Sequence, residues 1–424
     1  MRQEDALRVL KMGHSSYIAG EPGSGKTHLL RLFKKWLSSK NIPYALTAST
    51  GLAATHIEGS TIHSWSGLGV KKEIDEMGVD RLEQKKNLWE RFRKTEVLVI
   101  DEVSMLSGEF LDMLDRVARN MKRRDIPFGG LQMVFCGDFF QLPPVEGHSY
   151  AFQSSSWKEL FPLSCYLTSQ YRQRDEKLSR LLLSVRKGEA GEDVHSVLSS
   201  RKKKPKGEVT RLFTHNVDVD LLNEEKLGTL PGRERDFPVK RKGNKFQIES
   251  LLRFIPEVLR LKEGAEVIFT KNDPASRYVN GSRGTVISFE RNVPTVKLRS
   301  GVKVRAHAQT FKIEEDGKVL AEVTQIPLRL AWALTVHKSQ GMTIDEAEMD
   351  LGKSFVPGQG YVALSRVRSL QGLYLSSFNE MSLQVDERVV AADDLFRRHS
   401  AAAEERLGKL SLKDERKFIS ERRK

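Results

Sequence analysis

Cysteine is scarce in this sequence, and long apolar runs are missing. The cysteines among its 424 residues are Cys136 and Cys165, and neither lies at metal-ligand spacing from another cysteine or a histidine. This pattern argues against a disulfide framework or a structural zinc site and predicts two reduced core thiols. No run approaches about 18 uninterrupted apolar residues, and Met1 to Ala6 are polar and acidic, unlike an export signal. We therefore expect a soluble cytoplasmic protein without a membrane partner.

Acidic residues are outnumbered by basic ones. The chain has 70 Lys and Arg residues against 56 Asp and Glu residues, which gives a formal net charge of +14. A basic excess favours a polyanionic partner such as nucleic acid, although by itself it is a weak indication. The chain is also too long for one compact core, so two or more domains are expected.

The stretch from Gly20 to Thr27 fits the pattern G-x-x-x-x-G-K-[ST] at each fixed position. Glycines let backbone N–H groups turn toward phosphate oxygens, and the helix that follows adds the positive end of its dipole. Lys26 would reach the β- and γ-phosphates, and the Thr27 hydroxyl would hold Mg²⁺. A strand-like run before the loop and an amphipathic helix after it make an ordinary glycine-rich turn the weaker interpretation. We expect ATP to contact Gly20, Pro22, Gly23, Ser24, Gly25, Lys26 and Thr27.

A second buried strand, predicted from Val97 to Ile100, ends in the adjacent carboxylates Asp101 and Glu102. Asp101 can sit in the Mg²⁺ shell beside Thr27, and Glu102 can take a proton from an attacking water. Such a pair usually marks only a turn, but its position downstream of the phosphate loop favours a Walker B motif. The glutamate favours hydrolysis over transfer to a small acceptor.

Four further residues lie near the ends of predicted strands or domains. Ser49 follows a predicted strand and can meet a sugar-phosphate strand. Gln141, at the tip of another predicted strand, could sense the γ-phosphate. Arg172 lies at the junction to the second half and Arg366 beside a predicted helix, and each could cross an interdomain cleft toward the γ-phosphate. An arginine in a loop is more often simply solvated.

Helical and strand-like runs alternate through about the first 170 residues, which predicts an α/β fold with a parallel sheet. Residues 66–92 interrupt the alternation as an inserted subdomain, where a solvated surface helix and a role in DNA strand separation are equally supported. The basic run 201–206 is predicted to be a solvated loop. From 264 to 325 the sequence consists of short runs of strand-forming residues separated by turn residues, which predicts a small all-β module. The C-terminal segment is predicted to form a charged peripheral helix.

The order of these blocks resembles helicase superfamily one, and their detail resembles the petite integration frequency (PIF) family of DNA helicases. No single block is specific, but their joint match is, and it spans nearly the whole chain. Ser107 stands where the family usually has Asp, which still permits a helix N-cap. The matching blocks are Thr47–Ala54 with Gly59–Ser64, Asp101–Arg119, Phe128–Gly130 with Gly137–Val145, and Thr335–Thr343 with Tyr361–Ser369.

The resemblance implies roles for single residues. Gln3 would read the adenine, Glu102 would activate water, and Gly341 would lie against the nucleotide. Arg172 and Arg366 would be two arginine fingers. The full set implied for ATP, Mg²⁺ and catalysis is Gln3, Lys26, Thr27, Asp101, Glu102, Gln141, Arg172, Gly341 and Arg366. The positions that match single-strand contacts of the family are Thr61, His63, Thr335, His337 and Lys338. We expect Ser49 and Gly129 to bind DNA as well.

The resemblance also implies an architecture and an activity. It implies an ATP-driven motor that moves 5′ to 3′ on single-stranded DNA and unwinds tailed duplex DNA, in replication, repair, recombination or telomere maintenance. We expect a monomer when free, and a minimal, bacterial-type, nucleoid-associated core because the chain begins two residues before Gln3. The expected parts are a RecA-like domain at 1–169 with an inserted wedge at 66–92, a second RecA-like domain at 170–263 and 326–424, and an SH3-like insert at 264–325.

Three alternatives stay open. A non-enzymatic single-strand binder with a dead P-loop would not need Lys26, Glu102 and Arg366 together. A P-loop nucleotide kinase should lack the second half of the chain with its own arginine and β insert. A translocase that moves on DNA without unwinding it is compatible with every motif.

Overall fold

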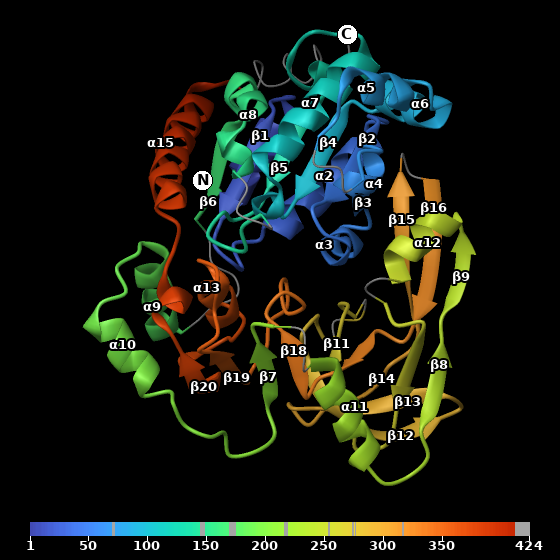
Figure 1. Ribbon diagram of the computed structural model, residues 1–424, viewed down its shortest axis with the longest axis vertical. Coiled ribbons are helices and arrows are strands. Elements are labelled where there is room, and N and C mark those ends of the chain that lie inside the picture. Colours follow the sequence, from blue (N-terminus) through green and yellow to red (C-terminus); the bar gives the residue numbers. More distant parts are fainter. Residues whose placement is uncertain are drawn as a thin grey trace.

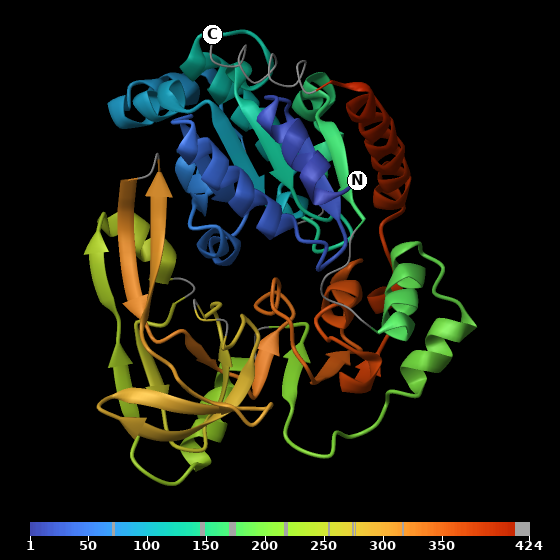
Figure 2. The ribbon, with the colours of Figure 1, turned by 180° about the vertical axis from the view of Figure 1, so that it is seen from behind.

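The computed structural model describes residues 1–69, 73–144, 149–168, 175–215, 219–252, 255–273, 275, 277–315 and 318–411. Within these residues the chain forms two α/β lobes with an antiparallel β region beside the second lobe (Figure 1). Seen from behind, the two lobes are again stacked one above the other (Figure 2). This agrees with the predicted pair of RecA-like domains. No helix among the described residues is both long enough and apolar enough to cross a bilayer.

Lobe 1 is built on a parallel sheet of six strands in the order β3-β2-β4-β5-β1-β6. Alternate side chains of its central strands enter two different apolar layers, so that Leu98 and Ile100 face one layer while Val97 and Val99 face the other. A strand buried on both faces reads as a continuous apolar run, which is why these strands are recognisable in the sequence. The strands are β1 (Ser16–Gly20), β2 (Tyr44–Ala48), β3 (Ser60–Thr61), β4 (Val97–Asp101), β5 (Gln132–Cys136) and β6 (Leu163–Leu167). Cys136 and Cys165 are free and buried in this sheet, as predicted.

Helices cover both faces of the lobe 1 sheet. One face carries α1 (Gln3–Lys11) and α2 (Lys26–Ser39), and the other carries α7 (Gly108–Lys122) and α8 (Ser155–Leu160). Ser107 is the N-cap of α7, because its hydroxyl accepts a hydrogen bond from the Phe110 N–H at 3.1 Å.

The predicted insert between β3 and β4 is helical. It contains α5 (Glu76–Glu83) and α6 (Lys86–Lys94), which follow α3 (Gly51–His56) and α4 (Ile62–Trp65). Phe92 packs against Trp65 with ring centroids 4.6 Å apart, and Arg91 donates to the Trp65 carbonyl at 2.8 Å. The insert is therefore anchored to lobe 1, and its part in strand separation stays a prediction.

Lobe 2 is built on a parallel sheet of four strands in the order β18-β7-β19-β20. The strands are β7 (Thr210–Phe213), β18 (Ala333–Thr335), β19 (Ala347–Leu351) and β20 (Leu373–Phe378). Its helices are α9 (Glu176–Arg186), α10 (Glu192–Ser199), α11 (Val219–Thr229), α13 (Gln359–Leu364) and α14 (Glu380–Leu383).

The basic run 201–206 is only partly a solvated loop. Arg201 donates to the carbonyls of Leu373 and Gln371 at 2.8 and 2.7 Å, beside the edge strand β20. The ammonium of Lys202 lies 4.5 Å from the centre of the Phe378 ring. The first two residues of the run are therefore anchored, whereas the side chains of Lys203 and Lys204 are exposed.

The C-terminal helix α15 (Glu387–Lys409) differs from its predicted place in the second domain, because it packs on β6 of lobe 1 (Figure 1). The Ser400 hydroxyl accepts a hydrogen bond from the Tyr166 N–H at 2.8 Å. Phe396 packs on Tyr17 with ring centroids 4.8 Å apart. Because charged residues are spread along the whole of α15, the apolar residues between them do not identify their partner in the sequence.

The antiparallel region starts earlier and ends later than the predicted limits of 264 and 325. Its strands pair in three separate sheets, so an SH3-like barrel stays a prediction. The five-stranded sheet contains β11 (Glu266–Phe269), β12 (Arg283–Glu290), β13 (Val293–Leu298), β14 (Lys303–Arg305) and β17 (Leu328–Leu330). The smaller sheets contain β15 (Gln309–Glu315), β16 (Lys318–Gln325) and β9 (Lys240–Gly243), and β8 (Arg235–Pro238) with β10 (Val258–Leu261). The helix α12 (Lys245–Leu252) packs on β16.

Candidate nucleotide site and nucleic-acid interface

The phosphate loop connects the end of β1 to the start of α2. Gly25 adopts the left-handed region with φ of +88° immediately before the helix, and a Cβ on Gly20 would lie 2.5 Å from the Ser24 hydroxyl oxygen. The Ser24 hydroxyl is buried and has no hydrogen-bond partner among the described residues. The Lys26 ammonium donates to the carbonyls of Gly20 and Glu21 at 2.6 and 3.2 Å. A glycine-lined cradle with an unpaired hydroxyl and a lysine fits the phosphate tail of a nucleotide.

A cavity of about 1240 Å³ opens at this loop and is lined by both lobes. Its lining contains most of the residues predicted to serve ATP and catalysis. From lobe 1 these are Pro22, Gly23, Gly25, Lys26, Thr27, Asp101, Glu102 and Gln141, and from lobe 2 they are Gly341 and Arg366. Residues separated by more than 300 positions in the sequence therefore face one space. Thr27 and Asp101 supply the hard oxygen ligands that Mg²⁺ prefers, so the donor set fits this metal.

The two Walker B carboxylates lie at the end of β4. Burial raises the pKa of Asp101, whose Oδ1 accepts a hydrogen bond from the Glu102 N–H at 2.9 Å. Burial and the neighbouring Asp101 charge raise the pKa of Glu102 to about 7, against the opposing effect of Lys26 and Arg366. Glu102 has a left-handed backbone with φ of +52°, which is uncommon for a residue with a side chain. A half-buried carboxyl with a raised pKa is suited to accept a proton from water.

A contact between the lobes reaches the same carboxylate. The Gln340 side-chain amide of lobe 2 donates to Glu102 Oε2 at 3.1 Å. The sequence interpretation did not assign a role to Gln340, although it lies inside the matching block 335–343 and next to Gly341. The candidate general base is therefore in contact with the second lobe.

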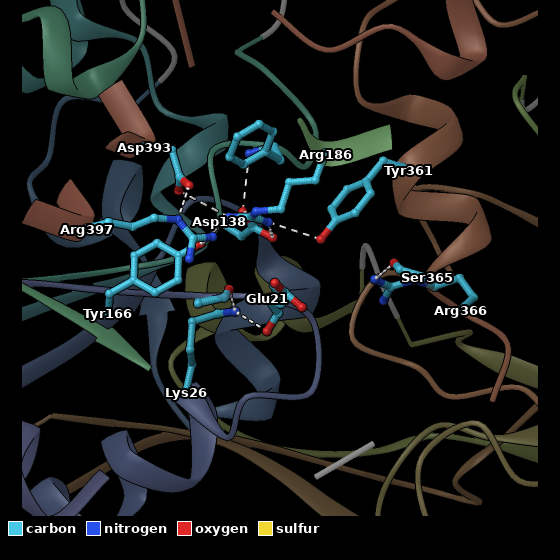
Figure 3. A network of polar contacts seen from close by, with 12 residues as sticks. Glu21, Lys26, Asp138, Tyr166, Arg186, Tyr361, Ser365, Arg366, Asp393 and Arg397 are labelled. Atoms are coloured by element: carbon cyan, nitrogen blue, oxygen red, sulfur yellow. Dashed lines mark hydrogen bonds and ion pairs between the residues drawn. The ribbon is translucent and has the colours of Figure 1, made fainter. Parts of the chain in front are cut away.

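Arg366 enters the cavity from lobe 2 and is 1% exposed. Its guanidinium donates to the Val362 carbonyl at 2.8 Å. It also donates to the Ser365 hydroxyl at 2.7 Å (Figure 3). Across the cavity, Gln141 is also buried. The predicted partner arginine, Arg172, lies outside the described residues.

Gln3 contacts the back of the phosphate loop. Its side-chain amide donates to the carbonyls of Ser24 and Gly25 at 3.2 and 3.3 Å. This contact connects α1 to the loop, and adenine reading by Gln3 stays a prediction.

Gly341 adopts φ of +77°, and a Cβ there would lie 3.2 Å from the His56 ring. Burial and the charges of Arg31 and Lys271 lower the pKa of His56 to about 4. His56 therefore forms a neutral part of the contact between α3 and lobe 2, which the sequence interpretation missed.

The DNA-binding candidates of lobe 1 follow the ends of β2 and β3. The Ser49 hydroxyl donates to the Glu102 carbonyl at 2.7 Å, and Thr61 Oγ1 accepts from the Ser64 N–H at 3.2 Å. The His63 ring packs on Phe110 at 4.4 Å, and burial lowers its pKa. One member of this group, Ser49, is thus bonded directly to the backbone of the catalytic candidate.

The DNA-binding candidates of lobe 2 follow the end of β18. Thr335 Oγ1 accepts a hydrogen bond from the Lys338 N–H at 3.1 Å, and the Lys338 ammonium lies 3.4 Å from Asp220. His337 is exposed at this edge of the sheet. In both lobes, the DNA-binding candidates therefore lie at the carboxyl ends of parallel strands.

Gly129 is not brought together with these candidates. It precedes β5, within the 3-10 turn Pro127–Gly130, and so lies at the amino edge of the sheet. Its φ is +62°, and a Cβ would lie 2.6 Å from the Ala118 carbonyl of α7. The backbone conformation and the close approach to α7 account for glycine at this position without DNA.

Comparison with known proteins gives consistent results. Residues 4–194 match the family model described as PIF1-like helicase. The ATP-dependent DNA helicase Pif1 of Psychrobacter sp. is 38% identical over 96% of this chain and 72% of its own length. The human ATP-dependent DNA helicase PIF1 is 39% identical over 92% of this chain, which spans 62% of that protein.

Solved structures of a Bacteroides sp. Pif1 are also similar. In complex with ADP-AlF4 that protein is 30% identical, with a TM-score of 0.82 over 93% of this chain and 96% of the other. The structure of Bacteroides Pif1 bound to ssDNA, 29% identical, gives a TM-score of 0.61 over 94% of this chain and 97% of the other.

Proposed function

The chain belongs to the PIF1-like helicase family of ATP-dependent DNA helicases, and we propose that it hydrolyses ATP between its two lobes to move 5′ to 3′ along single-stranded DNA and to unwind duplex ahead of it. The observation that carries the proposal is the shared cavity, which is lined from both lobes by the residues to which we assign hydrolysis. A ligand held from both sides can change how the lobes hold a polymer when it is cleaved.

We assign the residues of the cavity as follows. Lys26 and the amides of the phosphate loop bind the phosphates, while Thr27 and Asp101 would hold Mg²⁺, which neutralises charge on the phosphate oxygens when bound. Glu102 accepts a proton from the attacking water. Arg366 stabilises the charge that develops on the γ-phosphate, a role shared with Arg172 in the proposal.

Two hydrogen bonds support coupling between hydrolysis and DNA. The Ser49 hydroxyl bonds the Glu102 carbonyl, and Gln340 bonds the Glu102 carboxylate from the other lobe. A DNA strand that contacts Ser49 on lobe 1 and the Thr335–Lys338 segment on lobe 2 would therefore shift the position of Glu102, the proposed general base, from both lobes. We propose this pair of bonds as the link between DNA binding and turnover.

The TM-scores support a rearrangement on DNA. The ADP-AlF4 complex of the Bacteroides relative matches this chain better than the ssDNA complex does, at nearly equal identity. We propose that this chain, monomeric when free, moves its lobes or its β region when single-stranded DNA binds. The insert at 66–92 would then act as the wedge.

The test measures ATP hydrolysis with and without single-stranded DNA, and unwinding of duplexes with a 5′ or a 3′ tail. The expected result is hydrolysis stimulated by DNA and unwinding of the 5′-tailed duplex, both lost in Lys26→Ala. Equal hydrolysis with and without DNA would contradict the motor, and preference for the 3′ tail would contradict the direction. Displacement of a protein block from single-stranded DNA without duplex unwinding would instead identify a translocase.

A further inference from the structure

A buried arginine outside the cavity lining, Arg186, contacts residues of both lobes. Arg186, the last residue of α9, has a side chain that is 3% exposed, and the Asp138 side chain beside it is 0% exposed. The Arg186 guanidinium donates to both Asp138 carboxylate oxygens, each at 2.9 Å (Figure 3). The same guanidinium lies 3.9 Å from the centre of the Phe140 ring. Asp138 and Phe140 belong to lobe 1, whereas α9 packs on α13 of lobe 2.

The same guanidinium has further partners on both sides. It donates to the hydroxyl of Tyr361 on α13 at 3.0 Å and to the hydroxyl of Tyr166 on β6 at 2.8 Å. Asp393 on α15 lies 3.3 Å away and pairs in turn with Arg397 at 2.7 Å. A planar guanidinium can satisfy partners in several directions at once, which a lysine ammonium of similar charge cannot do in the same geometry.

Two of these partners hold backbone segments that carry the cavity-lining residues Gln141 and Arg366. The Gln141 N–H donates to the Asp138 carbonyl at 2.9 Å, so that the position of Asp138 sets the loop that carries Gln141. On the other lobe, the Ser365 N–H donates to the Tyr361 carbonyl at 3.0 Å, immediately before Arg366.

The loop and the helix also touch each other directly. Gly358 caps α13 with φ of +81°, and a Cβ there would lie 2.6 Å from the Phe140 carbonyl and 2.8 Å from the Gln141 carbonyl. The start of α13 therefore rests on the backbone of the Gln141 loop. A small displacement at this contact shifts Gln141 and Arg366 relative to each other.

From this arrangement we propose that Arg186 is a positioning residue, which clamps the Asp138 loop of lobe 1 to the Tyr361 helix of lobe 2 and thereby aligns Gln141 with Arg366 on the γ-phosphate. The inference rests on the proposed hydrolysis at this cavity and adds a residue that contacts neither nucleotide nor DNA. Its effect should appear in turnover and in stimulation by DNA, while the affinities for ATP and for single-stranded DNA are retained.

The experiment compares Arg186→Lys and Tyr361→Phe with the wild-type chain. Tyr361→Phe removes one hydroxyl and leaves the Arg186–Asp138 pair intact, so it tests the clamp even where Arg186→Lys does not fold. The matched control is Tyr150→Phe, which removes a buried tyrosine hydroxyl from Asp386, a contact of 3.3 Å outside the clamp.

In Arg186→Lys we expect DNA-stimulated kcat to fall by about 10- to 100-fold, the scale of a misplaced reacting group, while the KM for ATP and the Kd for single-stranded DNA change less than about twofold. Tyr361→Phe should show the same pattern with a smaller loss, and Tyr150→Phe should match the wild type. In a Gln141→Ala background the Arg186→Lys change should cost little more, because it acts through that residue.

Unchanged kcat in Tyr361→Phe, additive effects with Gln141→Ala, or a parallel loss of ATP affinity, DNA affinity and melting temperature would each overturn the clamp. A wild-type chain that hydrolyses ATP in response to DNA while both variants match it would overturn the clamp alone. A wild-type chain that shows no such response would overturn the proposed function and the clamp with it.

Discussion

Glu102 combines several unusual structural features in one residue. It is half-buried beside the buried Asp101, has a left-handed backbone and accepts a hydrogen bond from the opposite lobe. The adjacent carboxylate and the left-handed backbone each cost free energy, and such costs concentrate at functional sites. The local geometry therefore supports its assignment as the general base.

Replacing Glu102 with glutamine should separate binding from chemistry. Because glutamine keeps the shape but cannot take the proton, Glu102→Gln should bind ATP while turnover falls by about 10²- to 10⁴-fold. Binding of a fluorescent ATP analogue and steady-state hydrolysis measure the two effects. Glu189→Gln, at an exposed glutamate after α9, is the control and should behave as the wild type. Loss of ATP binding in Glu102→Gln would show that the residue has a different role.

Gly129 differs from Glu102, because its unusual backbone needs no functional explanation. It is a predicted DNA-binding position, but its close packing against α7 accounts for the glycine. In Gly129→Ala the added Cβ meets the Ala118 carbonyl in a strained backbone region, so the free energy of unfolding should fall by about 1–3 kcal/mol. Denaturant titration measures the loss. Gly207→Ala is the control, because no atom lies within 4 Å of its added Cβ. A folded Gly129→Ala chain with normal stability and weakened DNA binding would restore Gly129 to the DNA interface.

The elements of lobe 1 are positioned by caps and by apolar layers. The helix α7 begins at Gly108 after the Ser107 cap and buries its apolar side, including Phe110 and Leu114, under the sheet. It also supplies the carbonyl on which Gly129 rests and the ring on which His63 packs. The two ends of α7 therefore contact opposite edges of the lobe 1 sheet.

Ser107 tests this element. Ser107→Ala removes the hydroxyl that accepts from the Phe110 N–H, and we expect a loss of about 1 kcal/mol in unfolding free energy. Ser107→Asp keeps an acceptor at the same place and should retain or slightly raise stability, since a carboxylate also favours a helix N-terminus. Thermal or denaturant unfolding distinguishes the two variants. An equal loss of unfolding free energy in both variants would show that the hydrogen bond to the Phe110 N–H does not stabilise the helix.

At the scale of the whole molecule, charge and lobe arrangement govern binding to DNA. The net charge of +14 favours a polyanion, and contacts to the backbone of a strand release counterions. In the proposed function the strand crosses both lobes, so the charges that matter are those at the carboxyl ends of the two parallel sheets. Basic residues elsewhere should contribute little.

Salt titration tests that distribution. Affinity for single-stranded DNA should fall linearly in a plot of log K against log salt concentration, and Lys338→Ala should reduce the slope by about 0.7 if it contacts one phosphate. Lys206→Ala, in the basic run before β7, should leave the slope unchanged. Fluorescence anisotropy at several salt concentrations provides the measurement. An altered slope in Lys206→Ala alone would move the DNA path away from Lys338.

The sequence by itself determined the features that depend on local order. The phosphate loop, the buried strands around it and the Ser107 cap follow from residue spacing, because strand burial and helix capping involve neighbours along the chain. The Walker B pair follows from the same kind of pattern. The resemblance to the family also came from local patterns, because each matching block is a short run of neighbouring residues.

The tertiary structure alone decided which distant residues meet. It brought Gln340 onto Glu102, Arg186 onto Asp138 and α15 onto β6, contacts between positions far apart in the chain for which no local spacing exists. It separated Gly129 from the DNA candidates and widened the β region, whose added strands are only three or four residues long and so show no clear period. Contacts across lobes depend on how whole layers stack, and that arrangement is a property of the folded molecule.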